Sequence, residues 1–381
     1  MPTPLTTFTL DQLRSRTSEK WRHYEPDVLP LWVAEMDSTI APGVTEVLKR
    51  ALTEADTGYA SGNDYGLAFA EFSAARWNWS VDEQDTIPVI DVMRGIGDVI
   101  RLASVPGAPV VITPPVYYPF ARVVEALGRT LMNAPLDARG RLNPETLEAA
   151  CAEAAALGQG GLILISNPHN PTGVAHTRAE LEQLAEIANR HGLRIVADEI
   201  HAPLVLPGWE FVPILQVAGA ETALVVTSAS KSFNLAALKA GLIVGGPASR
   251  DDIRQWRGRV SNGASHWGML AHAAAYRTGG AWLDDVVADI AHNSSLLTDL
   301  VATHLPGARY QPLESTYLAW VDCRELGLGN DPAATFLEKG RVAFSSGPVF
   351  GEGGAGFVRI NIATSPEILT EALARAGSVL F

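Results

Sequence analysis

The sequence is poor in cysteine and in positive charge, and each shortage excludes a class of protein. Cys151 and Cys323 are the only two cysteines, and they form no Cys-x-x-Cys pair. We therefore expect neither a disulfide framework nor a cysteine zinc site, and no bound metal. Lysine and arginine number 29 against 42 aspartate and glutamate residues, a formal net charge of −13. Nucleic acids and anionic membrane surfaces require clustered lysine and arginine, so neither is expected as a partner.

Long hydrophobic runs, internal repeats and low-complexity linkers are also absent from the sequence. No apolar stretch approaches the roughly 18 residues that a membrane-spanning helix needs. The first residues, MPTPLTTFTLDQLRSRTSEKW, lack the apolar centre of a secretion signal, so we expect a soluble cytoplasmic protein. Apolar residues make up 47% of the chain and charged residues 19%, which favours a large packed core, and 381 residues suit two domains.

Between about residues 87 and 246, short apolar strands alternate with amphipathic helices. One predicted helix begins at Asn143 as N-cap with Pro144 following, and another begins at a capping box formed by Thr177 and Glu180. The predicted strands are apolar throughout and comprise residues 87–92, 161–166, 193–197, 222–226 and 241–244. Such strands are typical of a parallel sheet covered by helices on both faces, so we predict an α/β fold.

Residues from about 285 onward show a different pattern. A predicted helix over 281–304 is followed by the segments STYLAWVDCREL and GFVRINIA. We therefore predict a large domain over 46–284 and a smaller C-terminal domain over 285–381, with residues 1–45 as an N-terminal segment that packs with the small domain.

Polar residues follow three of the predicted strands at the point where each strand ends. They are residues 167–173, 198–201 and 228–231. Ligands of parallel α/β sheets bind beyond the carboxyl ends of the strands, so these three segments are expected to meet in one crevice.

Each of these segments contains a residue with two or more possible roles. Lys231, in TSASKSFN (227–234), is either a solvated loop lysine or a desolvated amine that attacks carbonyl groups, which its small neighbours favour. Asp198 is a helix cap, a member of a structural ion pair, or the partner of a heteroaromatic cation. The segment SNPHNPTG (166–173) is a proline-braced turn or a means of presenting the Asn170 amide.

In this order along the chain, these features resemble the fold type I pyridoxal-phosphate enzymes of the aminotransferase class I/II superfamily. The resemblance runs from PLWVAEMDS (30–38) to GFVRINIA (356–363). Within the superfamily, several segments resemble the MalY/PatB group of cystathionine β-lyases, also called C–S lyases. Those segments are LWVAEMD, GY (58–59), NPHNPTG, DEIHAPL (198–204), TSASKSFN, STYLAWVD (315–322) and FGEGGAGFVRIN. The resemblance implies pyridoxal 5'-phosphate as cofactor and a mostly parallel sheet with a smaller α+β C-terminal domain.

The resemblance also assigns roles to the residues after the strands. Lys231 is similar to the lysine that forms a Schiff base with the cofactor and then moves the Cα proton. Asp198 is similar to the partner of the pyridine nitrogen. Asn170 is similar to the donor to the phenolic oxygen of the cofactor, close to the substrate. Tyr117 is similar to the catalytic aromatic residue that stacks on the cofactor ring, with Tyr118 as its rival for that place.

The resemblance also implies which residues contact the substrate. Arg359 is similar to the arginine that binds the α-carboxylate of the substrate, for which a planar guanidinium is well suited, although a surface salt bridge is the alternative. The pocket that selects the substrate is expected to include Val33 and Ala34 of the N-terminal segment.

The implied phosphate site combines a helix N-terminus with hydroxyl groups. The segment MRGIGDVIRLA is expected to open a helix and to direct the backbone amides of Ile96 and Gly97 at the phosphate. Ser228 and Ser230 are expected to add hydroxyl donors. The Asp98 carboxylate is expected to turn away, because it would repel a phosphate.

Three more residues complete the implied site. Lys239 stands where many superfamily members have an arginine that clamps the phosphate. His201 stands where many have a tyrosine, and it either hydrogen-bonds near the phenolic oxygen or only packs. Tyr59 is similar to a tyrosine that reaches the phosphate of the neighbouring subunit, unless it is an ordinary packed aromatic. The role of Tyr59 implies a homodimer with sites at the interface, against which residues 1–45 also pack.

The activity implied by the resemblance is β-elimination from cystathionine or related cysteine S-conjugates, which releases a thiol, pyruvate and ammonia. The alternative is transamination between an L-amino acid and a 2-oxo acid, which uses the same groups. A third possibility is a regulatory protein that keeps the fold and binds a transcription factor. The presence of Lys231, Asp198, Asn170 and Arg359 together argues against loss of the chemistry.

Overall fold

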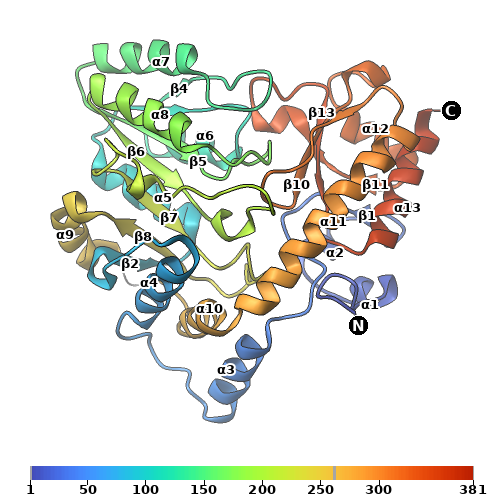
Figure 1. Ribbon diagram of the computed structural model, residues 1–381, viewed down its shortest axis with the longest axis horizontal. Coiled ribbons are helices and arrows are strands. Elements are labelled where there is room, and N and C mark those ends of the chain that lie inside the picture. Colours follow the sequence, from blue (N-terminus) through green and yellow to red (C-terminus); the bar gives the residue numbers. More distant parts are fainter. Residues whose placement is uncertain (1, 261–262, 381) are drawn as a thin grey trace.

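A seven-stranded sheet forms the centre of the larger part of the molecule (Figure 1). The computed structural model describes residues 2–260 and 263–380. The strand order is β2-β8-β7-β6-β5-β3-β4. Its strands are β2 (Thr86–Val89), β3 (Pro109–Ile112), β4 (Thr130–Asn133), β5 (Gly161–Ser166), β6 (Leu193–Asp198), β7 (Leu224–Thr227) and β8 (Gly241–Gly245). The predicted strands are confirmed with shifts of one to three residues at their ends.

The sheet is mostly parallel, and β8 is the exception. It pairs antiparallel with β7 on one side and with β2 on the other. The sequence prediction placed residues 241–244 in the parallel series, which is wrong in direction. The reason is the connection: residues 228–240 form turns and no crossover helix, so the chain returns beside β7 instead of crossing over to begin a parallel strand.

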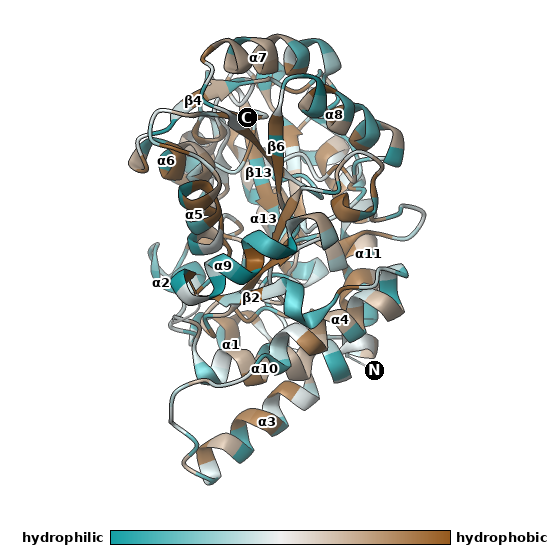
Figure 2. Cartoon of the chain, turned by 90° about the vertical axis from the view of Figure 1, so that its left-hand side faces the viewer, coloured by the Kyte–Doolittle hydropathy of each residue, from teal (hydrophilic) through white to brown (hydrophobic). Residues whose placement is uncertain are grey.

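Both faces of the sheet are buried, as the continuous apolar strands predicted. Along β5, Ile163 and Ile165 pack into one core, whereas Leu162 and Leu164 pack into the other. The first core contains α7 (Pro144–Ala156) and α8 (Arg178–Arg190), and the second contains α5 (Val92–Ala103), α6 (Pro119–Ala126) and α9 (Arg250–Val260). Figure 2 shows the strands as hydrophobic and the outer sides of the covering helices as largely hydrophilic.

The helix-start signals read from the sequence are confirmed. Asn143 caps α7 by accepting a hydrogen bond from the Glu145 amide. Thr177 and Glu180 form the complete capping box of α8. The remaining helices around the large sheet are α3 (Pro42–Thr53), α4 (Asp64–Trp77) and α10 (His266–Thr278).

A four-stranded antiparallel sheet of order β12-β13-β10-β9 forms the smaller part. Its strands are β9 (Arg309–Tyr310), β10 (Leu318–Asp322), β12 (Ser345–Ser346) and β13 (Phe357–Asn361), and α12 (Pro332–Gly340) and α13 (Pro366–Gly377) accompany them. The helix α11 (Gly280–His304) continues across the proposed domain boundary at 284 and 285, and Figure 1 shows it extending from the large part to the small part. Within residues 2–260 and 263–380, no helix is both long and apolar enough to cross a bilayer.

The N-terminal segment contributes two short helices and one strand. They are α1 (Leu10–Arg14), α2 (Glu19–Arg22) and β1 (Leu29–Pro30). The strand β1 pairs in parallel with β11 (Val342–Ala343), so this segment contacts the C-terminal part of the chain. Residues 31–38 then follow without helix or strand, and an ion pair fixes their far end. Lys20 Nζ lies 2.7 Å from Asp37 Oδ2, and each side chain is 1% exposed.

Removal of the Lys20 charge is expected to destabilise the fold strongly. In Lys20→Met, the Asp37 carboxylate stays buried without its partner, which costs about 3 to 5 kcal/mol of unfolding free energy. Urea denaturation followed by circular dichroism measures this loss. The matched control is Lys49→Met on the exposed side of α3, which should change the unfolding free energy by less than about 0.5 kcal/mol. Equal effects of the two substitutions would show that the buried pair has no special role.

Candidate active site

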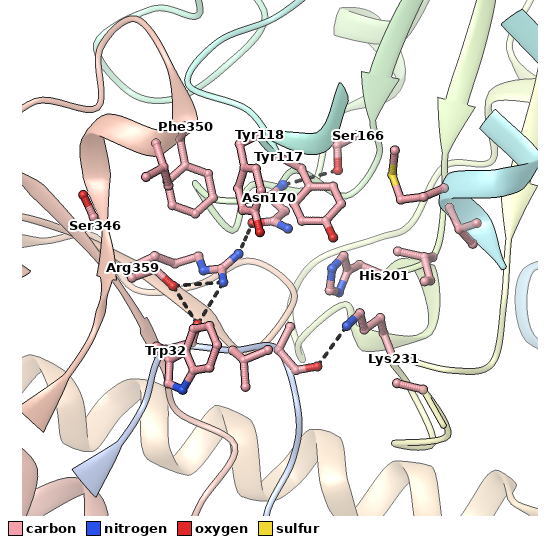
Figure 3. A pocket seen from close by; sticks show the side chains of 18 of the residues that line it. Trp32, Tyr117, Tyr118, Ser166, Asn170, His201, Lys231, Ser346, Phe350 and Arg359 are labelled. Atoms are coloured by element: carbon pink, nitrogen blue, oxygen red, sulfur yellow. Dashed lines mark hydrogen bonds between the residues drawn. The ribbon is translucent and has the colours of Figure 1, made fainter. Parts of the chain in front are cut away.

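A cavity of about 910 Å³ lies beyond the carboxyl ends of β5, β6 and β7. The large sheet contributes Asn170, Asp198 and Lys231 to its wall, and the small sheet contributes Arg359. All three polar segments that follow the predicted strands therefore meet here, as the strand-end rule predicted. Figure 3 shows Lys231 and Arg359 reaching into the cavity from opposite sides.

Lys231 lies in the turns that follow β7 and is half-buried. Its Nζ donates a hydrogen bond of 2.9 Å to the carbonyl oxygen of Ala34. Burial, and next the charge of Arg359, lower the pKa of the Lys231 ammonium to about 8. The side chain forms no salt bridge within the described residues, and the charges of Glu35 and Asp198, which favour the ammonium form, only partly oppose this shift. A neutral, nucleophilic amine is therefore accessible near physiological pH.

Asp198 is the last residue of β6, and its side chain faces the cavity. Its Oδ1 accepts a hydrogen bond of 3.1 Å from the Ile200 amide. Burial nevertheless raises the pKa of the carboxyl group to about 7. Neither a structural ion pair nor a helix-cap role accounts for this residue. A cation bound in the cavity would stabilise a buried carboxylate in this position.

Arg359, on β13, is 5% exposed and forms no ion pair with an acid among the described residues. Its Nη1 donates to Asn170 Oδ1 at 2.9 Å, and its Nη2 donates to the Trp32 carbonyl oxygen at 2.9 Å and to Ser345 Oγ at 3.1 Å. Burial lowers the pKa of the guanidinium to about 10, so it stays charged at neutral pH. A buried cation without a carboxylate partner is able to bind an anion. The surface salt bridge considered from the sequence is not formed among the described residues.

Asn170 links the two sides of the cavity. Its Oδ1 accepts from Arg359, and its backbone amide donates to Ser166 Oγ at 3.3 Å. Within the described residues, the side-chain Nδ2 makes no hydrogen bond, so it can donate to a ligand.

Aromatic rings line the wall above these groups, as Figure 3 shows. Tyr117 is largely buried, and burial raises the pKa of its hydroxyl to about 12, so the phenol stays protonated. Its ring offers a flat apolar surface beside Lys231 and Asn170. The ring of Tyr118 instead lies 38% exposed near Phe350.

His201 is buried on the other side of the cavity. Burial, and next the charge of Lys231, lower the pKa of its imidazole to about 3, so the ring is neutral. Its Nδ1 has no hydrogen-bond partner within residues 2–260 and 263–380. A buried polar atom that is unsatisfied beside a cavity indicates a contact with a ligand there.

One end of the cavity has the composition of an anion site. It is lined by Ser230, by Lys239 and by the first residues of α5, Val92 and Met93. Free amides of a helix N-terminus and a lysine favour a phosphate. The N-cap of α5 is Asp91, whose Oδ1 accepts from the Arg94 amide at 2.9 Å and whose Oδ2 lies 3.1 Å from Lys239 Nζ.

The predicted amide donors Ile96 and Gly97 do not line this end, so that prediction is wrong. Both residues lie within α5, one turn beyond its start, and Ile96 is fully buried in the core. The glycines of this segment serve helix packing: a Cβ on Gly95 would lie 2.8 Å from the Val226 side chain. The aspartate that precedes the helix, a typical N-cap, was the sequence signal for the true start.

The predictions for Ser228, Ser230 and Asp98 at the phosphate end of the cavity have different outcomes. Ser228 does not line the cavity, because its hydroxyl donates to the Ala240 carbonyl oxygen at 2.7 Å and shapes the turn. Asp98 does not line the cavity, as expected, and its buried carboxylate pairs with Arg94 and Arg101 of the same helix. Ser230 lines the cavity as predicted.

The N-terminal segment supplies residues that sequence reasoning identified only in part. Val33 and Ala34 line the cavity as predicted, and Trp32 joins them. Tyr59 does not line the cavity of its own chain, because it is fully exposed on the loop between α3 and α4. Among the residues that the structure describes, no cluster of histidine, cysteine or acidic side chains can hold a metal ion.

Known proteins that match most or all of this chain belong to the family that the sequence motifs resemble. The sequence profile of the family "Aminotransferase class I and II" matches residues 47–376. A Mycobacterium tuberculosis protein named "Putative cystathionine beta-lyase" is 48% identical over 100% of this chain and 99% of its own. Cystathionine beta-lyase PatB from Bacillus subtilis is 30% identical over 93% of each chain.

A solved structure has the same fold. It is cystalysin from Treponema denticola, which contains a pyridoxal 5'-phosphate cofactor and is 27% identical to this chain. It superposes with a TM-score of 0.91 over 100% of this chain and 99% of its own. The match of the family profile to most of the chain, with the relatives and fold just described, establishes that this chain belongs to the aminotransferase class I and II family.

Proposed function

We propose that this protein is a pyridoxal 5'-phosphate-dependent C–S β-lyase, acting on cystathionine or related cysteine S-conjugates. The observation that carries the proposal is one cavity with three charged groups. It combines an amine of lowered pKa, Lys231, with a buried acid, Asp198, and a buried arginine, Arg359, that has no acidic partner among the described residues. Two relatives that cover almost the whole chain bear the name of this activity.

The donor set of the cavity fits the cofactor at each of its polar positions. Lys231 supplies a nucleophile for an aldehyde, and Asp198 supplies an anion for a protonated ring nitrogen. The free Nδ2 of Asn170 suits a phenolic oxygen, and the unsatisfied Nδ1 of His201 is available in the same cavity. The Tyr117 ring is a stacking surface. When bound, the cofactor withdraws electrons from the substrate Cα, so that the Cα–H bond breaks more easily.

The reaction requires three actions of the protein's own residues. Arg359 binds the α-carboxylate and thereby orients the substrate in the cavity. The Lys231 amine takes the proton from Cα, for which a pKa near the working pH is favourable. The bond between Cβ and sulfur then breaks, and the sulfur leaves with the electron pair. With cystathionine and one water molecule, the products are homocysteine, pyruvate and ammonia.

Several finer assignments belong to the same proposal. Ser230, Lys239 and the start of α5 would hold the phosphate. Tyr59 would reach the site of a second copy, so that the working unit is a homodimer, and its full exposure on a loop is compatible with that role. The division at residues 45 and 284 and the cytoplasmic location expected from the sequence are likewise proposed.

The lyase reaction is distinguished from transamination by its products. The purified holoenzyme, given L-cystathionine and no 2-oxo acid, is expected to release pyruvate and free thiol in equal amounts. Lys231→Ala is expected to release neither, because no amine remains to move the Cα proton. If the unmodified protein releases neither product but transfers the amino group once a 2-oxo acid is added, it is an aminotransferase and the proposal is wrong.

The attachment of the cofactor is expected to depend on pH through Lys231. The neutral amine is the nucleophile, and its pKa of about 8 means that its fraction grows as the pH rises through 8. The rate at which the cofactor-free protein takes up pyridoxal 5'-phosphate should therefore increase from about pH 6.5 and level off above about pH 9. Rapid-mixing absorbance measurements give this rate. A rate that falls over this interval contradicts the lowered pKa.

Asp91 is expected to weaken the binding of the phosphate. Its carboxylate lies at the start of α5 and engages Lys239, so it repels the phosphate and competes for its cation. Asp91→Asn keeps an N-cap side chain and removes the charge, so the cofactor should bind about fivefold more tightly. Equilibrium titration of the cofactor-free protein measures the Kd, with Glu153→Gln on the exposed side of α7 as a control of equal charge change. Weaker binding by Asp91→Asn would place the phosphate elsewhere.

A further inference from the structure

A second arginine, Arg122, lines the same cavity as Arg359. Tyr118 is the N-cap of α6, and Arg122 lies one turn later on the same helix. The Cζ of Arg122 lies 4.9 Å from the centre of the Tyr118 ring, and both residues line the cavity. Neither Tyr118 nor Arg122 is among the residues proposed to act on Cα and Cβ of the substrate.

Two aromatic rings connect the two arginines. The Cζ of Arg359 lies 4.9 Å from the centre of the Phe350 ring, and the rings of Phe350 and Tyr118 meet edge to face at 6.3 Å. These three steps limit the distance between the two guanidinium carbons to about 16 Å. Both rings also line the cavity, so they offer an apolar surface to a ligand that binds both arginines.

Arg122 has no acidic partner among residues 2–260 and 263–380. This distinguishes it from Arg94 and Arg101 on the neighbouring helix, which both pair with Asp98. The Arg122 guanidinium is exposed at the mouth of the cavity and is free to bind an anion from solution.

The dimensions fit a substrate with a carboxylate at each end. In an extended cystathionine, seven bonds separate the two carboxylate carbons, which lie about 9 Å apart. Each carboxylate carbon lies about 4 Å from the carbon of a guanidinium that binds it with two hydrogen bonds. The total reach of about 17 Å exceeds the upper limit of about 16 Å on the separation of the two guanidinium carbons, so cystathionine is long enough to bind both arginines. The thioether chain would lie over the rings of Phe350 and Tyr118.

We propose that Arg122 binds the distal carboxylate of the substrate. The protein thereby selects thioethers that carry an amino acid on both sides of the sulfur over S-alkyl cysteines. Asp331, at the N-cap of α12, lines the same cavity and is complementary to the ammonium group of that distal end. This inference rests on the proposed lyase function and adds the residue that determines its specificity.

The test compares two substrates that differ only in the distal amino acid. For the holoenzyme, kcat/KM is measured with L-cystathionine and with S-ethyl-L-cysteine by the release of pyruvate. In Arg122→Gln, the ratio of the two values should fall about tenfold, because a charged contact to one substrate alone is lost. Arg122→Lys should lower the ratio less, since it keeps the charge without the two-pronged contact. The matched control is Arg139→Gln, an exposed arginine outside the cavity, which should leave the ratio unchanged.

A binding measurement separates this inference from the proposed function. Calorimetric titration of L-cystathionine into the cofactor-loaded Lys231→Ala protein gives a Kd without turnover, and adding Arg122→Gln should raise that Kd about tenfold. An unchanged Kd, an unchanged ratio, or an equal loss of activity on both substrates would overturn the role of Arg122. If the unmodified protein releases pyruvate from neither compound, the lyase proposal fails, whereas the calorimetric result still decides the question of Arg122.

Discussion

The carbonyl oxygens of residues 32–36 are the acceptors on which the geometry of the site depends. The Ala34 oxygen accepts from Lys231 Nζ at 2.9 Å and from the Tyr317 hydroxyl at 3.1 Å, and the Trp32 oxygen accepts from Arg359. Because this stretch is neither helix nor strand, its carbonyl groups are free to accept from side chains. The stretch is fixed in turn by Asn361, whose Nδ2 donates to the Val33 and Glu35 oxygens, and by the buried ion pair at Asp37. Residues from both parts of the molecule thus take their positions from one short piece of backbone.

The chemical properties of the site arise because charged side chains are buried there without forming salt bridges among the described residues. Removal from water lowers the pKa of Lys231 to about 8 and raises that of Asp198 to about 7, so burial favours the uncharged form of each group. An ordinary salt bridge between the two would cancel these shifts and leave an inert pair. Arg359 is likewise bound by neutral oxygen atoms instead of a carboxylate, so its charge is available to a substrate. For Asp198 and Arg359, a bound ligand of the opposite charge would offset the free-energy cost of burying the charge.

The sequence predicted the part of the site that depends on local pattern. The apolar strands located the sheet, and the strand-end rule then identified Asn170, Asp198 and Lys231, because parallel strands place their carboxyl ends at one edge. Arg359 was found through the family resemblance. The phosphate end was misplaced at Ile96 and Gly97, because glycines that permit close packing of a helix look the same in sequence as glycines of a phosphate loop.

Other residues of the site had no local signal at all. Trp32 and Phe350 reach the cavity from segments without a regular strand, and only the folded chain brings them beside Arg359. Arg122, which has no acidic partner in the part of the chain that the structure describes, was also not singled out from the sequence, since contacts between distant helices and loops decide whether an arginine has an acidic neighbour. Periodicity reports which side of an element is buried, but it carries no information on which polar groups lack a partner.

The antiparallel direction of β8 has a consequence for how a ligand is held. Because the chain leaves β7 and returns along β8 without a crossover, Lys231 and Lys239 belong to one loop of thirteen residues, 228–240, and both line the cavity. A single stretch of backbone therefore sets the separation of these two side chains in the cavity wall, and under the proposed function this separation would match the distance from the aldehyde to the phosphate of the cofactor. Under that proposal, a pyridoxal that lacks its phosphate would contact Lys231 and leave Lys239 without a ligand.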